Sequence, residues 1–317
     1  MKSVSILLAL AGVGLGILLV ALLGTGKVVQ AVLSVGWGGF GALVGLELLL
    51  IVVIGVAWRL LCPGAKLWAV VWGRSVREGG VNILPLSEFG GLAFGARAVT
   101  LTGVPGPRAI ASTIADVAAE FMGEIPFIVF GIVMLSARQP DTSLVLPLGV
   151  GLGLLTGAFA AMIWAEHHWA ALYRVIARRV ASRWFRRAAE QADATQRELD
   201  DLLRRTRRLG AAAAIHLVGW SGSGLTVWIA YRLLGGRIDI VSAMALEGAL
   251  SCVLAVAFLV PAGIGVQEAS YVALGRLFGM PAHLSLSLSL VRRARDIVVG
   301  APALASWQAV EAAALRR

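Results

Sequence analysis

Three acidic side chains recur at one helical spacing within a long apolar stretch. Asp116, Glu120 and Glu124 stand at four-residue steps, which stacks the carboxylates on one face of a helix. A charge at the centre of a bilayer costs roughly 2.5–3.5 kcal/mol on insertion scales. Such a stripe therefore either faces a wet cavity or meets basic residues. The alternative is an interfacial stretch in which only Glu124 lies deep.

A second group of charges interrupts the last apolar stretch. It consists of Arg292, Arg293, Arg295 and Asp296. Arg292 and Asp296 are four positions apart and so are suited to pairing. A remaining arginine could meet the acidic stripe, or it could bind an anionic headgroup, because guanidinium matches phosphate geometry. A purely structural network of ion pairs is the alternative.

Single carboxylates complete the set of membrane-embedded charges. Glu47 and Glu247 each stand alone in an apolar stretch, and we interpret them as packing residues. Glu268 follows a proline- and glycine-rich turn, so we rank it higher as a site residue. Four residues are expected to shape the backbone of the candidate site, namely Pro85, Pro261, Gly263 and Gly265.

Two patterns imitate enzyme sites. Gly219 to Gly222 fits the G-x-S-G pattern of an intramembrane serine protease, and His283 could supply a base. Small residues in membrane helices more commonly serve close packing. Glu166 to His168 resembles a metal site, but adjacent helical residues point in different directions. We therefore predict no catalytic residue, no metal and no cofactor, and keep the protease as a minor alternative.

The composition shows which solvent these residues meet. The 317 residues are 58% hydrophobic and 15% charged, against roughly 25% charged in soluble domains, and the mean hydropathy is +0.84. The net charge of +10 lies in segments between apolar stretches, as the positive-inside rule expects. This distribution excludes nucleic acid as the expected partner. The two cysteines are too far apart in sequence to suggest a metal site.

The sequence predicts an all-α, polytopic integral membrane protein with one membrane domain over residues 1–317. About seven stretches reach the roughly 20 residues that a spanning helix needs. The first has no charge from Ser3 to Gly26 and is too long for a signal peptide. The predicted spans are 4–24, 36–57, 109–136, 143–165, 210–233, 240–260 and 283–308.

Arginine-rich segments predict the orientation. Residues 166–208 hold eleven arginines against six acids, and residues 58–108 are also basic. Both are expected in the cytoplasm, whereas 25–35 is expected outside, which places the N-terminus in the cytoplasm. Apolar residues in 166–208 recur at helical steps, which predicts either a helix on the membrane surface, contacting anionic headgroups, or a solvated helical hairpin.

Two apolar segments, 85–108 and 261–282, are broken by glycine and proline. We interpret both as re-entrant or broken helices, which a membrane tolerates only where protein or water covers the backbone. A shift of 176 residues places six of the ten prolines in three pairs, and also pairs Glu120 with Asp296. The spans related by this shift are predicted to run in opposite directions. This predicts an inverted repeat of 36–136 and 210–308.

The turn region also carries a family resemblance. Val260 to Glu268, followed by Gly275 and the Arg292 to Asp296 cluster, resembles the membrane domain of lysylphosphatidylglycerol synthases and the wider flippase-like family. A weaker match runs from Asn82 to Asp116. The hopanoid-biosynthesis-associated branch is the most similar. The usual Pro-Gly-Gly turn is Pro-Ala-Gly here, and no soluble aminoacyl-transferase domain follows residue 317, so lipid lysylation is not expected.

The resemblance implies a multi-pass protein of the bacterial inner membrane that handles or translocates a polar lipid or a hopanoid. The alternative is a non-catalytic scaffold for lipid-synthesis enzymes that uses 166–208 as a docking surface. The oligomeric state is left open. The predicted substrate-binding residues are Glu268, Arg292, Arg293, Arg295, Asp296, Asp116, Glu120 and Glu124.

Overall fold

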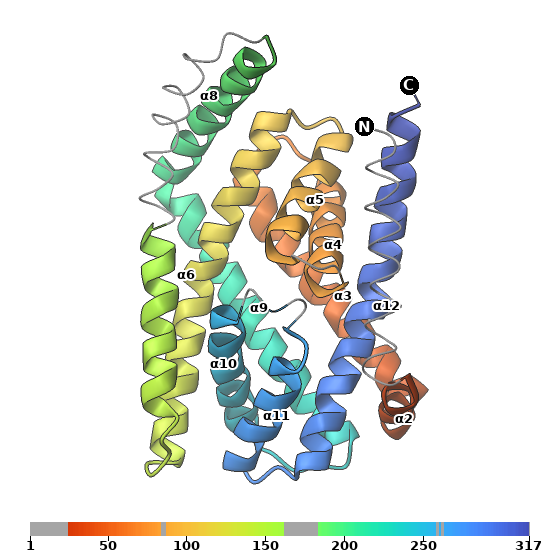
Figure 1. Cartoon of the computed structure of the whole chain (residues 1–317), viewed down its shortest axis with the longest axis vertical. Helices are drawn as coiled ribbons and strands as arrows, with labels where there is room; N and C mark the ends of the chain where they lie inside the picture. Colours follow the sequence, from red (N-terminus) through yellow and green to blue (C-terminus); the bar gives the residue numbers. More distant parts are fainter. Residues whose placement is uncertain (1–24, 84–86, 162–182, 258–259, 261–262, 317) are drawn as a thin grey trace.

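The computed structural model describes residues 25–83, 87–161, 183–257, 260 and 263–316. Every regular element within these ranges is a helix (Figure 1). The predicted first span, 4–24, lies outside the described residues, as do Pro85 and Pro261. The labelled helices are α2 (Thr25–Val35), α3 (Trp37–Leu61), α4 (Leu67–Ile83), α5 (Ser87–Leu101), α6 (Gly106–Arg138), α8 (Arg183–Arg204), α9 (Thr206–Leu233), α10 (Ile240–Val256), α11 (Val266–Leu277) and α12 (Ala282–Ala314).

Four of the described helices are long and apolar enough to cross a bilayer, namely α3, α6, α9 and α12. They correspond to four of the predicted spans. Both α6 and α12 begin directly after a proline, Pro105 and Pro281; a proline N-cap has no backbone N–H of its own to leave unpaired. In Figure 1, α6 runs from top to bottom and α12 from bottom to top.

The remaining spans and one loop differ from the prediction. The predicted spans 143–165 and 240–260 correspond to shorter apolar helices, Val145–Ala161 and α10. Residues 25–35, predicted to be an external loop, form α2 instead. This helix buries Ala31, Val32 and Val35 in the hydrophobic core, which a loop of mixed polarity would not do.

Two hairpins of short helices fill the space between the long ones. Helices α4 and α5 form one hairpin and α10 and α11 the other; Figure 1 shows the first in the upper half of the molecule and the second in the lower half. The longest of the four has 17 residues, or about 26 Å at 1.5 Å per residue. A hydrocarbon core is about 30 Å thick, so these helices enter the bundle without crossing it.

The first hairpin corrects the prediction that 58–108 is a basic loop. The broken segment 85–108 is only its second arm together with the start of α6, and its first arm is α4. Sequence reasoning passed over α4 because Arg74 and Arg77 lower its hydropathy. Both arginines are nevertheless buried, at 3% and 7% exposure.

The described part of the basic segment 166–208 packs onto the bundle. Helix α8 buries Leu199 and Leu202 against alanines of α6 and α9. Glu198 of α8 forms an ion pair with Arg108 at the start of α6, at 2.9 Å. Residues 166–182 lie outside the described residues. The apolar side of α8 therefore faces protein, and its arginines at 197, 204 and 205 are exposed.

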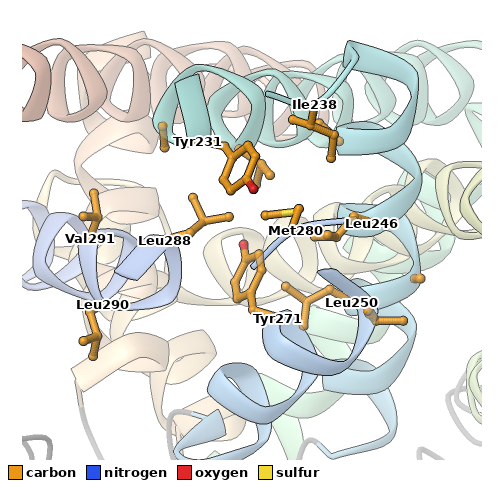
Figure 2. Close-up of a cluster of buried hydrophobic side chains, with 14 of the residues drawn as sticks. Tyr231, Ile238, Leu246, Leu250, Tyr271, Met280, Leu288, Leu290 and Val291 are labelled. Carbon is orange, nitrogen blue, oxygen red and sulfur yellow. The ribbon is translucent and has the colours of Figure 1, made fainter. Parts of the chain in front are cut away.

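The largest hydrophobic cluster lies in the half of the molecule that contains the α10–α11 hairpin. Figure 2 shows Tyr231 and Tyr271 on either side of Leu288 and Met280. Both tyrosine side chains are fully buried. The cluster joins α9, α10, α11 and α12 into one body, so the second hairpin is held by apolar packing as well as by the polar contacts described below.

Helices α4 and α12 cross at two glycines. A Cβ atom on Gly300 would lie 2.8 Å from the Cα atom of Gly79, which is backbone and cannot rotate away. We expect Gly300→Ala to destabilise the protein by about 1–3 kcal/mol, the usual range for overpacking, and to lower its melting temperature in detergent.

Gly45→Ala is the matched control, because a Cβ there meets nothing within 4 Å. The control should leave the melting temperature unchanged or raise it, since alanine favours a helix over glycine by about 1 kcal/mol. Equal melting temperatures for the two variants would contradict the close crossing of α4 and α12.

Candidate buried-charge site

Buried charge is concentrated where α4, α6 and α9 meet. Asp116 of α6 is 1% exposed, and its carboxylate oxygen Oδ2 lies 3.4 Å from both Arg74 and Arg77. The other oxygen, Oδ1, lies 3.0 Å from Nε2 of His216. We name this group the α6 cluster. Its members are Arg74, Arg77 and Glu78 of α4, Asp116 and Glu120 of α6, and His216 of α9.

Glu120 is the second acceptor for the two arginines. Its Oε1 lies 2.5 Å from Nη2 of Arg74, and its Oε2 lies 2.6 Å from Nη2 of Arg77. Charge-assisted hydrogen bonds of this length are the strong ones. The α4 hairpin is thus tied to α6 by two guanidinium groups that share two carboxylates.

The α6 cluster decides between two sequence-based alternatives. The acidic stripe meets basic residues, but these are Arg74 and Arg77 rather than an arginine of the 292–295 group. Asp116 and Glu124 are both buried. Burial inside the protein is therefore not confined to Glu124, because the carboxylate two turns before it is buried as well.

A second concentration of charge lies around α12. Glu247 of α10 is 1% exposed and contacts Arg292. It also accepts hydrogen bonds from the hydroxyls of Ser223, at 2.7 Å, and Tyr271, at 3.0 Å. Four helices thus meet at one carboxylate. We name this group, with the ion pairs that follow, the α12 cluster: Glu47, Ser223, Glu247, Tyr271, Arg292, Arg295 and Asp296.

The pairing within α12 differs from the prediction. Arg295 donates to Asp296 at 2.7 Å and reaches Glu47 of α3 at 3.0 Å. Arg292 pairs with Glu247 instead of Asp296. Glu47 and Glu247 were predicted to be isolated packing residues, and this is wrong: each is the partner of an arginine, because α3 and α10 bring them to the same level of α12.

The turn before α11 holds Glu268 and Arg293 together. Glu268 Oε1 lies 2.8 Å from Nη2 of Arg293, and its Oε2 accepts the N–H of Gly265 at 2.8 Å. Gly263 and Gly265 have φ angles of 59° and 79°, a region that side chains with a Cβ rarely adopt. The glycines thus shape the turn, as predicted, and Glu268 caps the helix that follows.

A small pocket opens beside the α12 cluster. Arg292, Arg295 and Ser223 contribute its polar atoms, and Leu43 and Val227 are among its apolar lining. Its free space is about that of one water molecule. A lipid headgroup does not fit in this conformation.

The enzyme-like patterns are not supported by the contacts around them. The hydroxyl of Ser221 donates to the carbonyl of Leu217, one turn earlier in α9. His283 is exposed in the first turn of α12. Glu166 to His168 lie outside the described residues. Among the residues that the structure describes, no group of three or more His, Cys, Asp or Glu side chains is placed to hold a metal ion.

Sequence reasoning missed six residues of the two clusters: Arg74, Arg77, Glu78, His216, Ser223 and Tyr271. Two signals were available. His216 is a titratable residue inside a predicted span, which marks a functional candidate by default. Arg74 and Arg77 stand three apart in an otherwise apolar run, so both lie on one face of a helix.

The fold and the buried charges define a multi-pass α-helical membrane protein whose polar residues are gathered inside the bundle. The chain belongs to the family described as the lysylphosphatidylglycerol synthase TM region, which matches residues 6–303. No curated protein and no solved structure matches the chain. Membership of this family indicates a membrane protein related to lipid metabolism.

Proposed function

We propose that this protein is a flippase-like translocator, not an enzyme, that moves a polar lipid or a hopanoid across the bacterial inner membrane. The observation that carries the proposal is the pair of charge clusters, each of which joins one short hairpin to one long helix and to α9. In each cluster an arginine, Arg74 or Arg292, forms an ion pair with a carboxylate inside the bundle. Charges inside a membrane domain commonly mark a substrate pathway.

The two halves of the chain support this proposal by their order and direction. A shift of 176 residues carries α6 (Gly106–Arg138) onto α12 (Ala282–Ala314) at both ends. The same shift carries the last residue of α5 onto that of α11. Equivalent helices run in opposite directions in Figure 1. We therefore propose an inverted repeat, the arrangement in which secondary transporters bind their substrates between two halves.

The substrate site of the proposed translocator lies where α3, α9 and α12 meet. Arg292 and Arg295 line the pocket there, and guanidinium is well suited to a phosphate or another anionic headgroup. The pocket is too small for such a group, so transport requires α12 to move relative to α3 and α9. Glu268 and Arg293 join α12 to the turn before α11, so breaking this pair would uncouple the α10–α11 hairpin from that movement.

Lipid movement in liposomes tests this function. We expect Arg293→Ala and Glu268→Ala each to slow the translocation of a fluorescent phospholipid at least about tenfold, as follows when about 1.4 kcal/mol is lost from the transport step. Cellular hopanoid content should change in parallel. Arg276→Ala is the matched control, because Arg276 is an exposed arginine of α11, the helix that also contains Glu268. If both variants remain folded and move lipid as fast as the native protein, the proposal is wrong.

The exposed arginines at the α8–α9 junction support a second proposal. Arg204, Arg205, Arg207 and Arg208 are all exposed, and we infer that the basic segment 166–208 contacts anionic headgroups of the cytoplasmic leaflet, with the N-terminus on that side. Each basic residue near such a surface contributes about 1 kcal/mol. The scaffold alternative assigns the same surface to a partner enzyme.

Replacing these four arginines with glutamine separates the two possibilities. Under our proposal, segment 166–208 of the variant is less protected from protease than that of the native protein in liposomes that contain phosphatidylglycerol. In neutral liposomes the two proteins are protected equally. Under the scaffold alternative the variant abolishes lipid synthesis in cells, while substitutions of the buried charges are tolerated.

A further inference from the structure

The α6 cluster contains more acid than base. Two guanidinium groups, of Arg74 and Arg77, face three carboxylates, of Glu78, Asp116 and Glu120. Arginine stays charged under all physiological conditions. With every carboxylate ionised and a neutral imidazole, the group carries one excess negative charge. Glu124, buried two turns along α6 from Asp116, adds a further carboxylate to the same helix face.

An excess charge inside a protein is costly to bury. Asp116 and His216 are each only 1% exposed, whereas Glu120 and Glu78 are 16% and 26% exposed, so water reaches Glu78 but does not screen the charge at Asp116. One proton removes the excess. The imidazole is the group placed to take that proton, because Nε2 of His216 already lies 3.0 Å from Oδ1 of Asp116. An imidazolium there would donate a charge-assisted hydrogen bond to the carboxylate.

The other charged residues around α9 are engaged elsewhere. On α3, Glu47 pairs with Arg295; on α10, Glu247 pairs with Arg292. On α8, Glu198 pairs with Arg108. The groups that face His216 are thus those of α4 and α6 already named, and no described basic residue competes with it for Asp116 apart from Arg74 and Arg77, each 3.4 Å away.

We infer that His216 and Asp116 form a proton-binding site, and that a proton is the coupling ion for lipid movement. The second part rests on the translocator function proposed above. The bond between these residues joins α9 to α6, and Asp116 and Glu120 in turn hold α4 through Arg74 and Arg77. Release of the proton would restore the excess negative charge and weaken the attachment of α9. Binding and release on opposite sides of the membrane would then bias the movement of the first hairpin.

Transport under a pH gradient tests the coupling. The liposomes would consist of phosphatidylethanolamine and phosphatidylglycerol, and a fluorescent phospholipid would be the probe. A gradient of about one pH unit should accelerate lipid movement about fivefold or more, the lower range of coupling between linked binding events, and an ionophore that collapses the gradient should abolish the gain. His216→Gln should lose the acceleration. His283→Gln is the matched control and should keep it, because His283 is exposed in the first turn of α12.

Proton binding is measured without transport in a second experiment. The chain has four histidines, so replacing His167, His168 and His283 with glutamine leaves one imidazole. Its ¹⁵N NMR signals should be those of a ring that is protonated on both nitrogens and donates to Asp116. Asp116→Asn in the same background should convert the signals to those of a neutral ring.

The outcomes distinguish the two proposals. If the rate of lipid movement does not change with the pH gradient, proton coupling is wrong and the translocator function is unaffected. Absence of any lipid movement overturns the translocator function and the coupling with it, and the NMR result alone then decides whether the proton site exists. A ring that stays neutral from about pH 5 to pH 8, across the range in which histidine normally titrates, overturns the site.

Discussion

Arg74→Ala is expected to destabilise the protein by about 3–5 kcal/mol, the range measured when one partner of a buried ion pair is removed. Arg74 is 3% exposed and contacts Glu78, Asp116 and Glu120. Its loss leaves three carboxylates with one remaining guanidinium between them. Because most of the penalty comes from the stranded charges, the double variant Arg74→Met, Glu120→Gln should recover part of the loss. Thermal unfolding in detergent measures both.

Arg97→Ala is the control for this prediction. Arg97 belongs to the same hairpin and pairs with Glu311 at 2.9 Å, but its side chain is 45% exposed. Exposed pairs contribute about 0–1 kcal/mol, so this variant should unfold at nearly the native temperature. If the two alanine variants have the same stability, Arg74 is solvated, and the α6 cluster as described is wrong.

Glu247→Ala is expected to have an effect of similar size on the other half of the protein. The carboxylate is 1% exposed and is the common acceptor for Ser223, Tyr271 and Arg292. Removing it leaves a charged guanidinium and two hydroxyls in place with no carboxylate. We expect a loss of about 3–5 kcal/mol and, under the proposed function, loss of lipid movement as well.

Glu247→Gln separates charge from shape. The amide oxygen can still accept from one or two of the three donors, so this variant should be more stable than Glu247→Ala but less stable than the native protein. Asp201→Ala provides the exposed comparison, because Asp201 is 58% exposed and pairs with Arg205 on the surface, and it should cost about 0–1 kcal/mol. A fully stable Glu247→Ala variant would show that Arg292 finds water or another acceptor, and that the α12 cluster does not hold the hairpin.

Long apolar helices were predictable because hydropathy over about 20 residues reports directly on the bilayer. The predicted spans 109–136 and 283–308 begin within a few residues of the observed starts of α6 and α12, and a proline precedes each helix. The α4 helix was not predicted. Its arginines gave it the composition of a cytoplasmic loop. Asp116 and Glu120, which neutralise these charges inside the protein, are more than a helix away in sequence.

The site was predictable in some of its members but not in its pairing. Asp116, Glu120, Arg292 and Arg295 stood out because a charge in an apolar stretch is expensive. Which charges meet depends on the level at which neighbouring helices cross, and this is a property of tertiary packing. Local spacing favoured the pairing of Arg292 with Asp296, whereas α10 places Glu247 beside Arg292. Sequence spacing alone carries no information on that choice.

The burial of Arg74 and Arg77 has a consequence for the synthesis of the protein. These residues leave the ribosome 42 and 39 positions before Asp116, and His216 follows Asp116 after another 100. In α4, only Glu78 is available to neutralise the two arginines when the hairpin first reaches the insertion machinery. We expect it to wait at the cytoplasmic interface and to enter the bundle only once α6 is inserted. Assembly order would then follow charge neutralisation rather than the order of the chain.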